Sequence, residues 1–325
     1  MVSAYLFDQR QGERVDDWAG ALHSLNKNQI LWIDLVDASK DETVDVLDAL
    51  DLGAAAELKL GDPERRPCVE QFERHLRVTA VAVSDTERDP ARERIVVDCF
   101  LGSNWILTVR GADIAALDDF RDAAEGKGEV GLLDAPSFLT TLSEWVINSY
   151  LRAFDEIEET LDEIDVEAIA HLSKDLEEQL EQLGAARRRV GRLRRTLAPH
   201  REVFATLSHS EFDPLSSEAS AKRFVGLTAR VDAALASARD VRDGIASSFD
   251  VLIVGTEHRT NEIVKILTLA SILLLPGALL AGLAGMNVNI SAHTFVHSPL
   301  FWVVVTAVIL IGIATLAAAR LRQWI

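Results

Sequence analysis

Two long uncharged runs mark the C-terminal part of the chain. Residues 266–284 and 300–319 contain no Asp, Glu, Lys or Arg. At 1.5 Å of rise per residue, each run would form about 30 Å of helix, which matches the hydrocarbon core of a bilayer. The pattern therefore predicts two transmembrane helices, the first over 266–284 and the second over 300–319.

Residues 1–135 have a different pattern, in which short runs rich in Val, Ile and aromatic residues are separated by turn residues. Such runs predict β-strands, here at residues 2–7, 30–35, 76–83, 95–101 and 105–109. Residues 43–52 carry apolar residues at a helical spacing, and Gly53 after them favours a C-terminal stop. We expect an α/β domain over 1–135 with its strand order open, and we expect Cys68 and Cys99 to be reduced core residues.

From Pro136 onwards the apolar residues recur every three or four positions with charged residues between them, which predicts long helices. Twelve acidic residues lie between Asp155 and Glu181, whereas residues 187–195 contain six arginines. This pattern predicts a long charged helical hairpin over 136–212 whose arms exchange charge. The alternative is that the acidic arm is a dedicated cation-collecting face.

A second, much longer helix follows the hairpin. Asp213-Pro214 and the serines after it are typical of a turn and a helix N-cap, and no helix breaker follows before Pro276. The sequence predicts one helix from about Ser216 to Ala284, on the order of 100 Å long. Residues 213–265 would form its cytoplasmic stalk, and the chain as a whole is predicted to be an α+β membrane protein.

Charges at the ends of the two apolar runs predict the topology. Arg259 and Lys265 precede the first run and Arg320 and Arg322 follow the second, whereas residues 288–298 have no Lys or Arg. The first 25 residues also lack a signal-peptide pattern. We expect both termini, including the tail 320–325, in the cytoplasm and the loop 285–299 outside, in a cell membrane such as the bacterial inner membrane.

The net charge of −18 argues against nucleic acid or anionic lipid as the main partner and permits cations as partners. The two apolar runs add the lipid bilayer as an expected partner. No nucleophile or metal-protease motif is present, so the sequence does not predict an enzyme, and no prosthetic cofactor is expected.

One face of the first membrane helix and of the stalk before it is polar or small. At 100° per residue, this face contains Asn261, Val264, Thr268, Ser271, Leu275, Ala278 and Gly282. A subunit with two spans cannot enclose a water-filled path alone, so the stripe favours a ring of copies around a pore. The alternative is that Thr268 and Ser271 merely bond back to the carbonyls four residues earlier.

A motif follows the first span directly. The motif consists of Gly285, Met286 and Asn287. Residues 260–262 and 265–268 precede it, and residues 322–325 form a basic, Trp-containing ending. The chain resembles the CorA family of two-span divalent metal-ion transporters, whose Gly-Met-Asn motif lies at this membrane boundary. Residues 32–35, 69–70 and 105–109 are similar to segments of the family's cytoplasmic domain.

The resemblance implies a funnel-shaped homopentamer that passes hydrated divalent cations, Mg²⁺ foremost and also Co²⁺ or Ni²⁺. In the family, the residues matching Asn287 and the Gly285 carbonyl form a selectivity ring that hydrogen-bonds the ion's hydration shell. Mg²⁺ releases water reluctantly, which suits such a ring. The family loop commonly has an acidic residue, but residues 288–298 have none. His293 and His297 instead raise the alternative of a Zn²⁺-preferring transporter.

Carboxylates continue the polar stripe into the stalk. Asp243, Asp250 and Glu257 recur every seven residues, and Asp250 matches a family ring at the cytoplasmic mouth. The three would form the cytoplasmic mouth or a regulatory metal site between copies, with ordinary solvated positions as the alternative. Residues 224–227, where the family has an intersubunit aspartate, contain no carboxylate. The remaining rival is a membrane-tethered signalling or scaffold protein without conductance.

Overall fold

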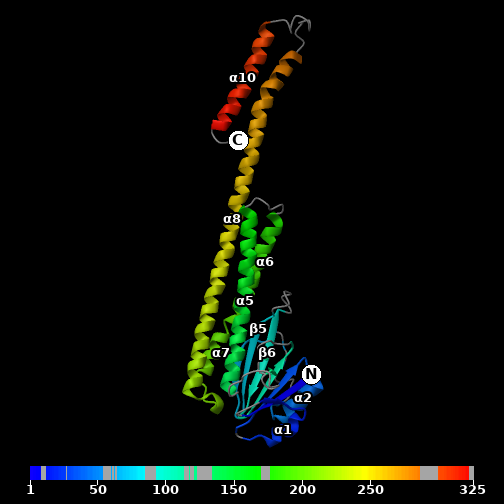
Figure 1. The fold of residues 1–325 in the computed structure, drawn as a ribbon, viewed down its shortest axis with the longest axis vertical. Helices are drawn as coiled ribbons and strands as arrows, with labels where there is room; N and C mark the ends of the chain where they lie inside the picture. Colours follow the sequence, from blue (N-terminus) through cyan, green and yellow to red (C-terminus); the bar gives the residue numbers. More distant parts are fainter. Residues whose placement is uncertain are drawn as a thin grey trace. The chain divides into compact units, whose positions relative to one another are not determined.

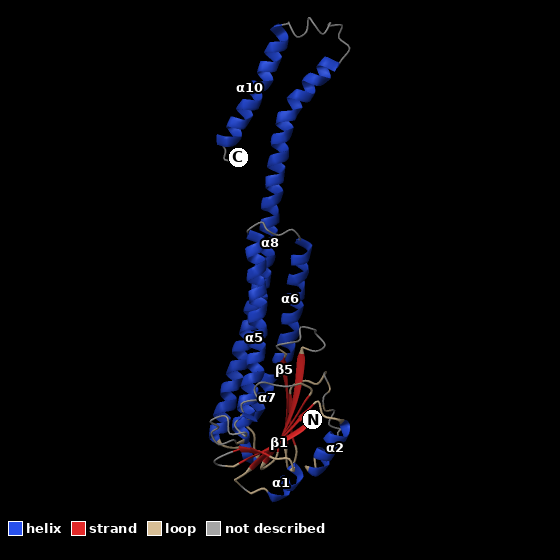
Figure 2. Cartoon of the chain, turned by 45° about the vertical axis from the view of Figure 1, so that its right-hand side comes forward, coloured by secondary structure: helices blue, strands red, loops and turns tan. Residues whose placement is uncertain are grey.

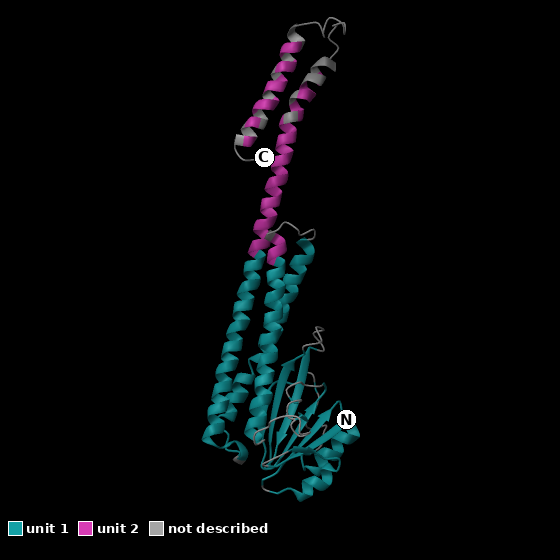
Figure 3. Ribbon diagram, in the orientation of Figure 1, with its two compact units in different colours: residues 1–164, 175–249 teal, residues 165–174, 250–325 magenta. Residues whose placement is uncertain are grey.

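The computed structural model describes residues 1–8, 12–26, 28–53, 60, 62, 64–84, 93–112, 117, 121–122, 134–169, 176–285 and 299–321. The chain divides into two units, which Figure 3 colours separately: residues 1–164 with 175–249, and residues 165–174 with 250–325.

The first unit contains a mixed β-sheet, shown in Figure 1. Its strands are β1 (Val2–Phe7), β2 (Gly12–Arg14), β3 (Ile30–Val36), β4 (Cys68–Gln71), β5 (Leu76–Val83), β6 (Arg94–Leu101) and β7 (Trp105–Arg110). Among the described residues the order is β2-β1-β3-β7-β6-β5-β4. β3 and β7 pair in parallel and the other neighbours are antiparallel. The domain predicted as α/β is therefore built mainly from antiparallel pairs.

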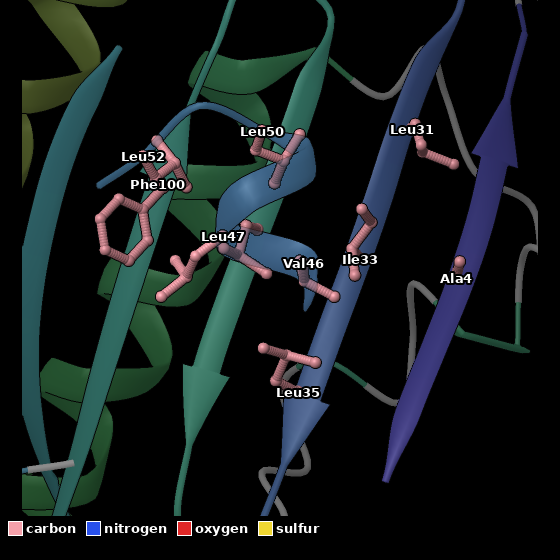
Figure 4. Packing of buried hydrophobic residues seen from close by; sticks show 10 residues of the cluster. Ala4, Leu31, Ile33, Leu35, Val46, Leu47, Leu50, Leu52 and Phe100 are labelled. Carbon is pink, nitrogen blue, oxygen red and sulfur yellow. The ribbon is translucent and has the colours of Figure 1, made fainter. Parts of the chain in front are cut away.

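Helices α1 (Trp18–Ser24) and α2 (Lys40–Ala49) contribute to a hydrophobic core at the sheet. Figure 4 shows Val46 and Leu47 of α2 beside Ile33 and Leu35 of β3, with Phe100 of β6 in the same cluster. All five side chains are fully buried. Burial of each such side chain contributes about 1.5–3 kcal/mol, so this cluster ties α2 firmly to the sheet.

The predicted bounds of α2 were wrong at both ends. The helix begins at Lys40 because Ser39 and Glu42 form a reciprocal capping box. It ends at Ala49 because the chain already turns at Asp51, whose φ is 55°, before Gly53 takes its φ of 85°. Gly53 follows the stop and does not form it.

Helical elements follow the sheet along the chain, as Figure 2 shows. They are α5 (Ala135–Ile169), α6 (Leu176–Leu197), α7 (His200–Leu207), the 3₁₀ turn η2 (Asp213–Leu215), α8 (Glu218–Gly285) and α10 (Pro299–Leu321). α5 packs on the sheet face opposite α2, where Phe138 meets Trp32 edge to face with ring centroids 5.4 Å apart.

The expected exchange of charge between the hairpin arms is confirmed at one point. Arg189 of α6 donates to Glu156 of α5 at 3.1 Å and to the buried Glu93 at 2.6 Å. Arg192 adds a longer ion pair to Glu93 at 3.7 Å. The arginine-rich arm thus neutralises a carboxylate beside the sheet as well as one on the acidic arm.

The two cysteines differ from each other in environment. Cys99 in β6 is buried and burial raises its pKa strongly, so it is an inert core thiol. Cys68 is only partly buried because it begins the edge strand β4. The prediction of a core position is confirmed for Cys99 and is wrong for Cys68.

Candidate ion-conducting helix

The expected long helix is confirmed as α8, which runs without a break from Glu218 to Gly285. Its residues 218–249 belong to the first unit and residues 250–285 to the second. In the first unit, one side of α8 is buried at alternating steps of three and four residues, at Phe224, Leu227, Val231, Ala234, Ala238, Val241, Ile245 and Ser248. This spacing is that of a coiled-coil seam, so this side of the helix is occupied by the chain's own core.

The predicted acidic line lies on the opposite side of α8. Asp243 and Asp250 are exposed and lie five positions after the seam residues Ala238 and Ile245, which is the outermost position of a heptad. Glu257, seven positions further on, is also exposed. Asp243 contacts its neighbour Arg242 at 3.3 Å. In the described part of the single chain, no group of three or more His, Cys, Asp or Glu side chains is arranged to hold a metal ion. A regulatory metal site formed by these acids stays a prediction about several copies.

The predicted pore stripe continues the same heptad line into the second unit. Asn261, Val264, Thr268, Ser271, Leu275, Ala278 and Gly282 are all exposed in the single chain. The hydroxyl of Thr268 donates to the Val264 carbonyl at 2.7 Å, and that of Ser271 donates to the Leu267 carbonyl at 2.8 Å. Both hydroxyl protons therefore bond back to the helix backbone, as the alternative interpretation predicted. Each oxygen keeps acceptor capacity towards water, so the pore-lining role stays a prediction.

Within the described residues, α8 is the helix whose length and apolar composition suffice to cross a membrane. Its side chains there are highly exposed in the single chain, at 68% for Ile266 and 70% for Leu275. Such exposure needs an apolar surrounding, either lipid or other helices. The second predicted span is helical as α10, and its crossing of a membrane stays a prediction.

Part of the predicted site lies outside the described residues. Gly285 is the last residue of α8, whereas Met286 and Asn287 of the motif, and the loop residues His293 and His297, are not described. Their proposed roles therefore rest on the sequence.

Sequence reasoning missed a buried polar network in the segments of β3 and β7 that carry the family resemblance. Arg110 donates to Asp34 at 2.6 Å, Thr108 donates to Asp34 at 2.6 Å, and the Trp32 indole donates to Thr108 at 3.0 Å. The signal was present as an Asp in the middle of an apolar strand and an Arg at the end of another. The network joins the parallel pair beneath α5, so these side chains tie β3 to β7 in addition to the backbone pairing.

Comparisons with known proteins agree with this architecture. A family model described as CorA-like Mg²⁺ transporter protein matches residues 27–319. The curated "Cobalt/magnesium transport protein CorA" of Thermotoga maritima is 23% identical over 224 residues, which are 69% of this chain and 63% of that protein. The matched region thus spans less than two thirds of that relative.

Solved structures show the same fold. The complete CorA magnesium transporter of Methanocaldococcus jannaschii matches with a TM-score of 0.77 at 20% identity, covering 100% of this chain and 99% of that one. The full-length CmaX protein matches with a TM-score of 0.71 at 20% identity, covering 99% and 97%. The ZntB cytoplasmic domain from Vibrio parahaemolyticus gives 0.60 at 15% identity over 79% and 98%. An α/β domain followed by a long stalk helix is common to this chain and the full-length CorA structure.

Proposed function

The chain belongs to the CorA-like Mg²⁺ transporter family, and from this premise we propose that it is a channel for divalent metal cations. The observation that carries the proposal is the single helix α8, which continues from the folded domain into an apolar segment and ends at Gly285, the first residue of the Gly-Met-Asn motif. The side of α8 that faces away from the chain's own core is here named the outward line. Its polar side chains can bind hydrated cations: Asp243, Asp250, Glu257, Asn261, Thr268 and Ser271.

We propose a homopentameric ring in which the outward line of each α8 faces a central path. One copy cannot surround water, so the exposed polar line needs other copies to form a pore. Gly285 and Asn287 would then form the outer selectivity ring, and Asp250 the cytoplasmic mouth. The chain would lie in the cell membrane with both termini in the cytoplasm and the loop outside.

Mg²⁺ is the proposed substrate, with Co²⁺ and Ni²⁺ as further ions. The curated relative is named as a cobalt and magnesium transport protein, and amide and carbonyl oxygens suit a strongly hydrated ion. The pair His293 and His297 in the loop supports a second candidate, a preference for Zn²⁺, because imidazole binds softer divalent ions.

The proposal is tested by reconstituting the full chain in proteoliposomes and following Mg²⁺, Zn²⁺, Co²⁺ and Ni²⁺ entry with ion-sensitive dyes. We expect Mg²⁺ entry above that of empty vesicles. Faster entry of Zn²⁺ that is lost in the variant His293→Ala/His297→Ala would select the second candidate. No flux of any of the four ions would overturn the proposal in favour of a membrane tether.

The selectivity ring gives the sharpest prediction. Asn287→Ala should abolish Mg²⁺ entry, because alanine cannot bond the ion's hydration shell, while the oligomer measured by light scattering in detergent stays intact. Asn289→Ala, two residues further along the loop, is the matched control and should transport like the parent. Parental flux in Asn287→Ala would show that the ring is built from other residues.

A further inference from the structure

Helix α6 carries a repeated basic surface that the proposed channel does not use. A glycine followed by a pair of arginines occurs twice on this surface, with the second set seven residues after the first. We name these residues the arginine face: Gly184, Arg187, Arg188, Gly191, Arg194 and Arg195. All four arginines are exposed. Unlike Arg189 and Arg192, which pair with Glu93, none of the four has an ion-pair partner in the described part of the chain. The hairpin's own charge exchange leaves this surface unmatched.

The two glycines leave the middle of this surface without side chains of its own. A Cβ added at Gly184 would meet only the Arg188 side chain at 3.4 Å, and one at Gly191 only the Arg195 side chain at 3.8 Å. Both arginines therefore lie beside a bare stretch of helix backbone. Another helix can approach closely there and place its acidic side chains between the guanidinium groups.

A complementary surface lies on α5 of the same chain. Asp155, Glu158, Glu159 and Asp162 are all exposed, and we name them the acidic face. They fall opposite the buried side of α5, which contains Ile157, Leu161 and Ile164. None of the four acids has an ion-pair partner among the described residues. Asp155 and Asp162 are seven residues apart, so both faces repeat every ~10.5 Å of helix.

We propose that the arginine face of one copy docks on the acidic face of the next copy. A closed ring requires two different, complementary surfaces on each subunit, and these two faces have opposite charge and the same repeat. Each copy has a net charge of −18, so copies repel one another unless local opposite charges meet. Screening over about 8 Å at physiological salt restricts this attraction to facing residues. The inference rests on the ring of the proposed function and specifies one of its contacts.

Charge reversal in the full chain tests the docking. Arg188→Glu/Arg195→Glu should weaken subunit association about tenfold at low salt, a change of ~1.4 kcal/mol, and the loss should shrink at high salt. Association is measured as the subunit concentration at which the detergent-solubilised oligomer half dissociates, read by mass photometry. Arg14→Glu/Arg66→Glu changes the net charge equally at exposed sites elsewhere and should associate like the parent.

Rescue identifies the partner surface. Adding Asp155→Lys/Asp162→Lys to the reversed arginines exchanges the two signs and should restore parental association. If reversal has no effect beyond the control, or if the exchange fails to restore association, the docking is refuted. Loss of ATP or polyphosphate binding with unchanged association would instead assign the arginine face to a soluble polyanion.

A second measurement does not depend on overall stability. Chains with Asp162→Cys and chains with Arg188→Cys, both in a Cys68→Ser background and with different tags, are co-expressed and treated with a short bismaleimide. A doubly tagged adduct is expected, and none is expected when Arg14→Cys replaces Arg188→Cys. If the parent is an oligomer that conducts Mg²⁺ but the two cysteine variants form no doubly tagged adduct, the docking is refuted and the proposed function stands. A monomeric parent refutes both.

Discussion

At the scale of single residues, three side chains complete the hydrogen bonding of β5 where it extends past its neighbour β4. The Val81 N–H donates to His200 Nε2 at 3.1 Å, and the Tyr150 hydroxyl donates to the Val81 carbonyl at 2.8 Å. The Val83 N–H donates to Ser149 at 3.0 Å. Unpaired buried backbone groups are costly, so these contacts from α5 and α7 hold the helices to the sheet.

His200 makes this junction sensitive to acid. Burial lowers its pKa to about 4, whereas an unfolded histidine titrates near 6.5. Between these values the unfolded chain binds more protons, so stability is lost as the pH falls from about 6.5 to about 4, by roughly 3 kcal/mol at most. His200→Gln keeps an acceptor for Val81 without titrating. Its urea midpoint should therefore change less than the parent's across this pH window, and an equal change in both proteins would exclude His200 as the cause.

Some residue roles could be read from the sequence and others could not. The positions of Asp243, Asp250 and Glu257 on one side of α8 follow from seven-residue spacing alone. The partners of Asp34 and His200 come from residues 76 and 119 positions away. Contacts of that range depend on strand order and helix packing, which no local pattern encodes.

At the scale of elements, strongly patterned segments were predicted well. β1 and β5 match their predicted ranges, and β3, β6 and β7 are each one residue longer than predicted. Long apolar runs between turn residues leave little choice of where a strand begins and ends. The short β2 and β4 were missed because a polar strand of three or four residues has no apolar period. The capping residues Ser39 and Glu42 were readable in the sequence and would have corrected the start of α2.

The helix α8 supports a prediction about closure of the path. Leu275 is the one large apolar residue in the membrane part of the outward line, so a ring of such leucines would exclude water when the helices close. Leu275→Ser should leak, raising Mg²⁺ entry into proteoliposomes under conditions that close the parent. Ile266→Ser is the control, because Ile266 is equally exposed, at 68% against 70%, but faces the other side of the helix. Equal entry in parent and Leu275→Ser would place Leu275 away from the path.

At the scale of the whole molecule, the sequence predicted the order of parts along the chain, and the single chain shows which surfaces remain for other copies. The seam from Phe224 to Ser248 is filled by the first unit's own core. The opposite line of α8 carries carboxylates that are exposed in one copy, Asp243, Asp250 and Glu257. Sequence spacing gave this line, but its isolation from the chain's own core became visible only once the buried side of α8 was known.

Five copies of that line would bring like charges together around one axis, and this crowding predicts regulation by the transported ion. Repulsion between the Asp250 carboxylates would spread the stalks unless a divalent cation neutralises them, so Mg²⁺ should tighten the cytoplasmic part and protect it from proteolysis. In Asp250→Asn the neutral amides no longer repel. Stalks of this variant should stay together without Mg²⁺, and the Mg²⁺-dependent part of the protection should largely disappear.

The measurement is a Mg²⁺ titration of limited trypsin digestion on the detergent-solubilised oligomer. Glu262→Gln removes an exposed carboxylate of α8 that lies five positions after Glu257, about 140° away around the helix, and it should keep the parental titration. Glu257→Gln, one heptad towards the membrane, should reduce the Mg²⁺ effect as Asp250→Asn does, because both acids belong to the same line. A parental titration in Asp250→Asn would rule out Asp250 as a sensor and return the acidic line to ordinary solvated positions.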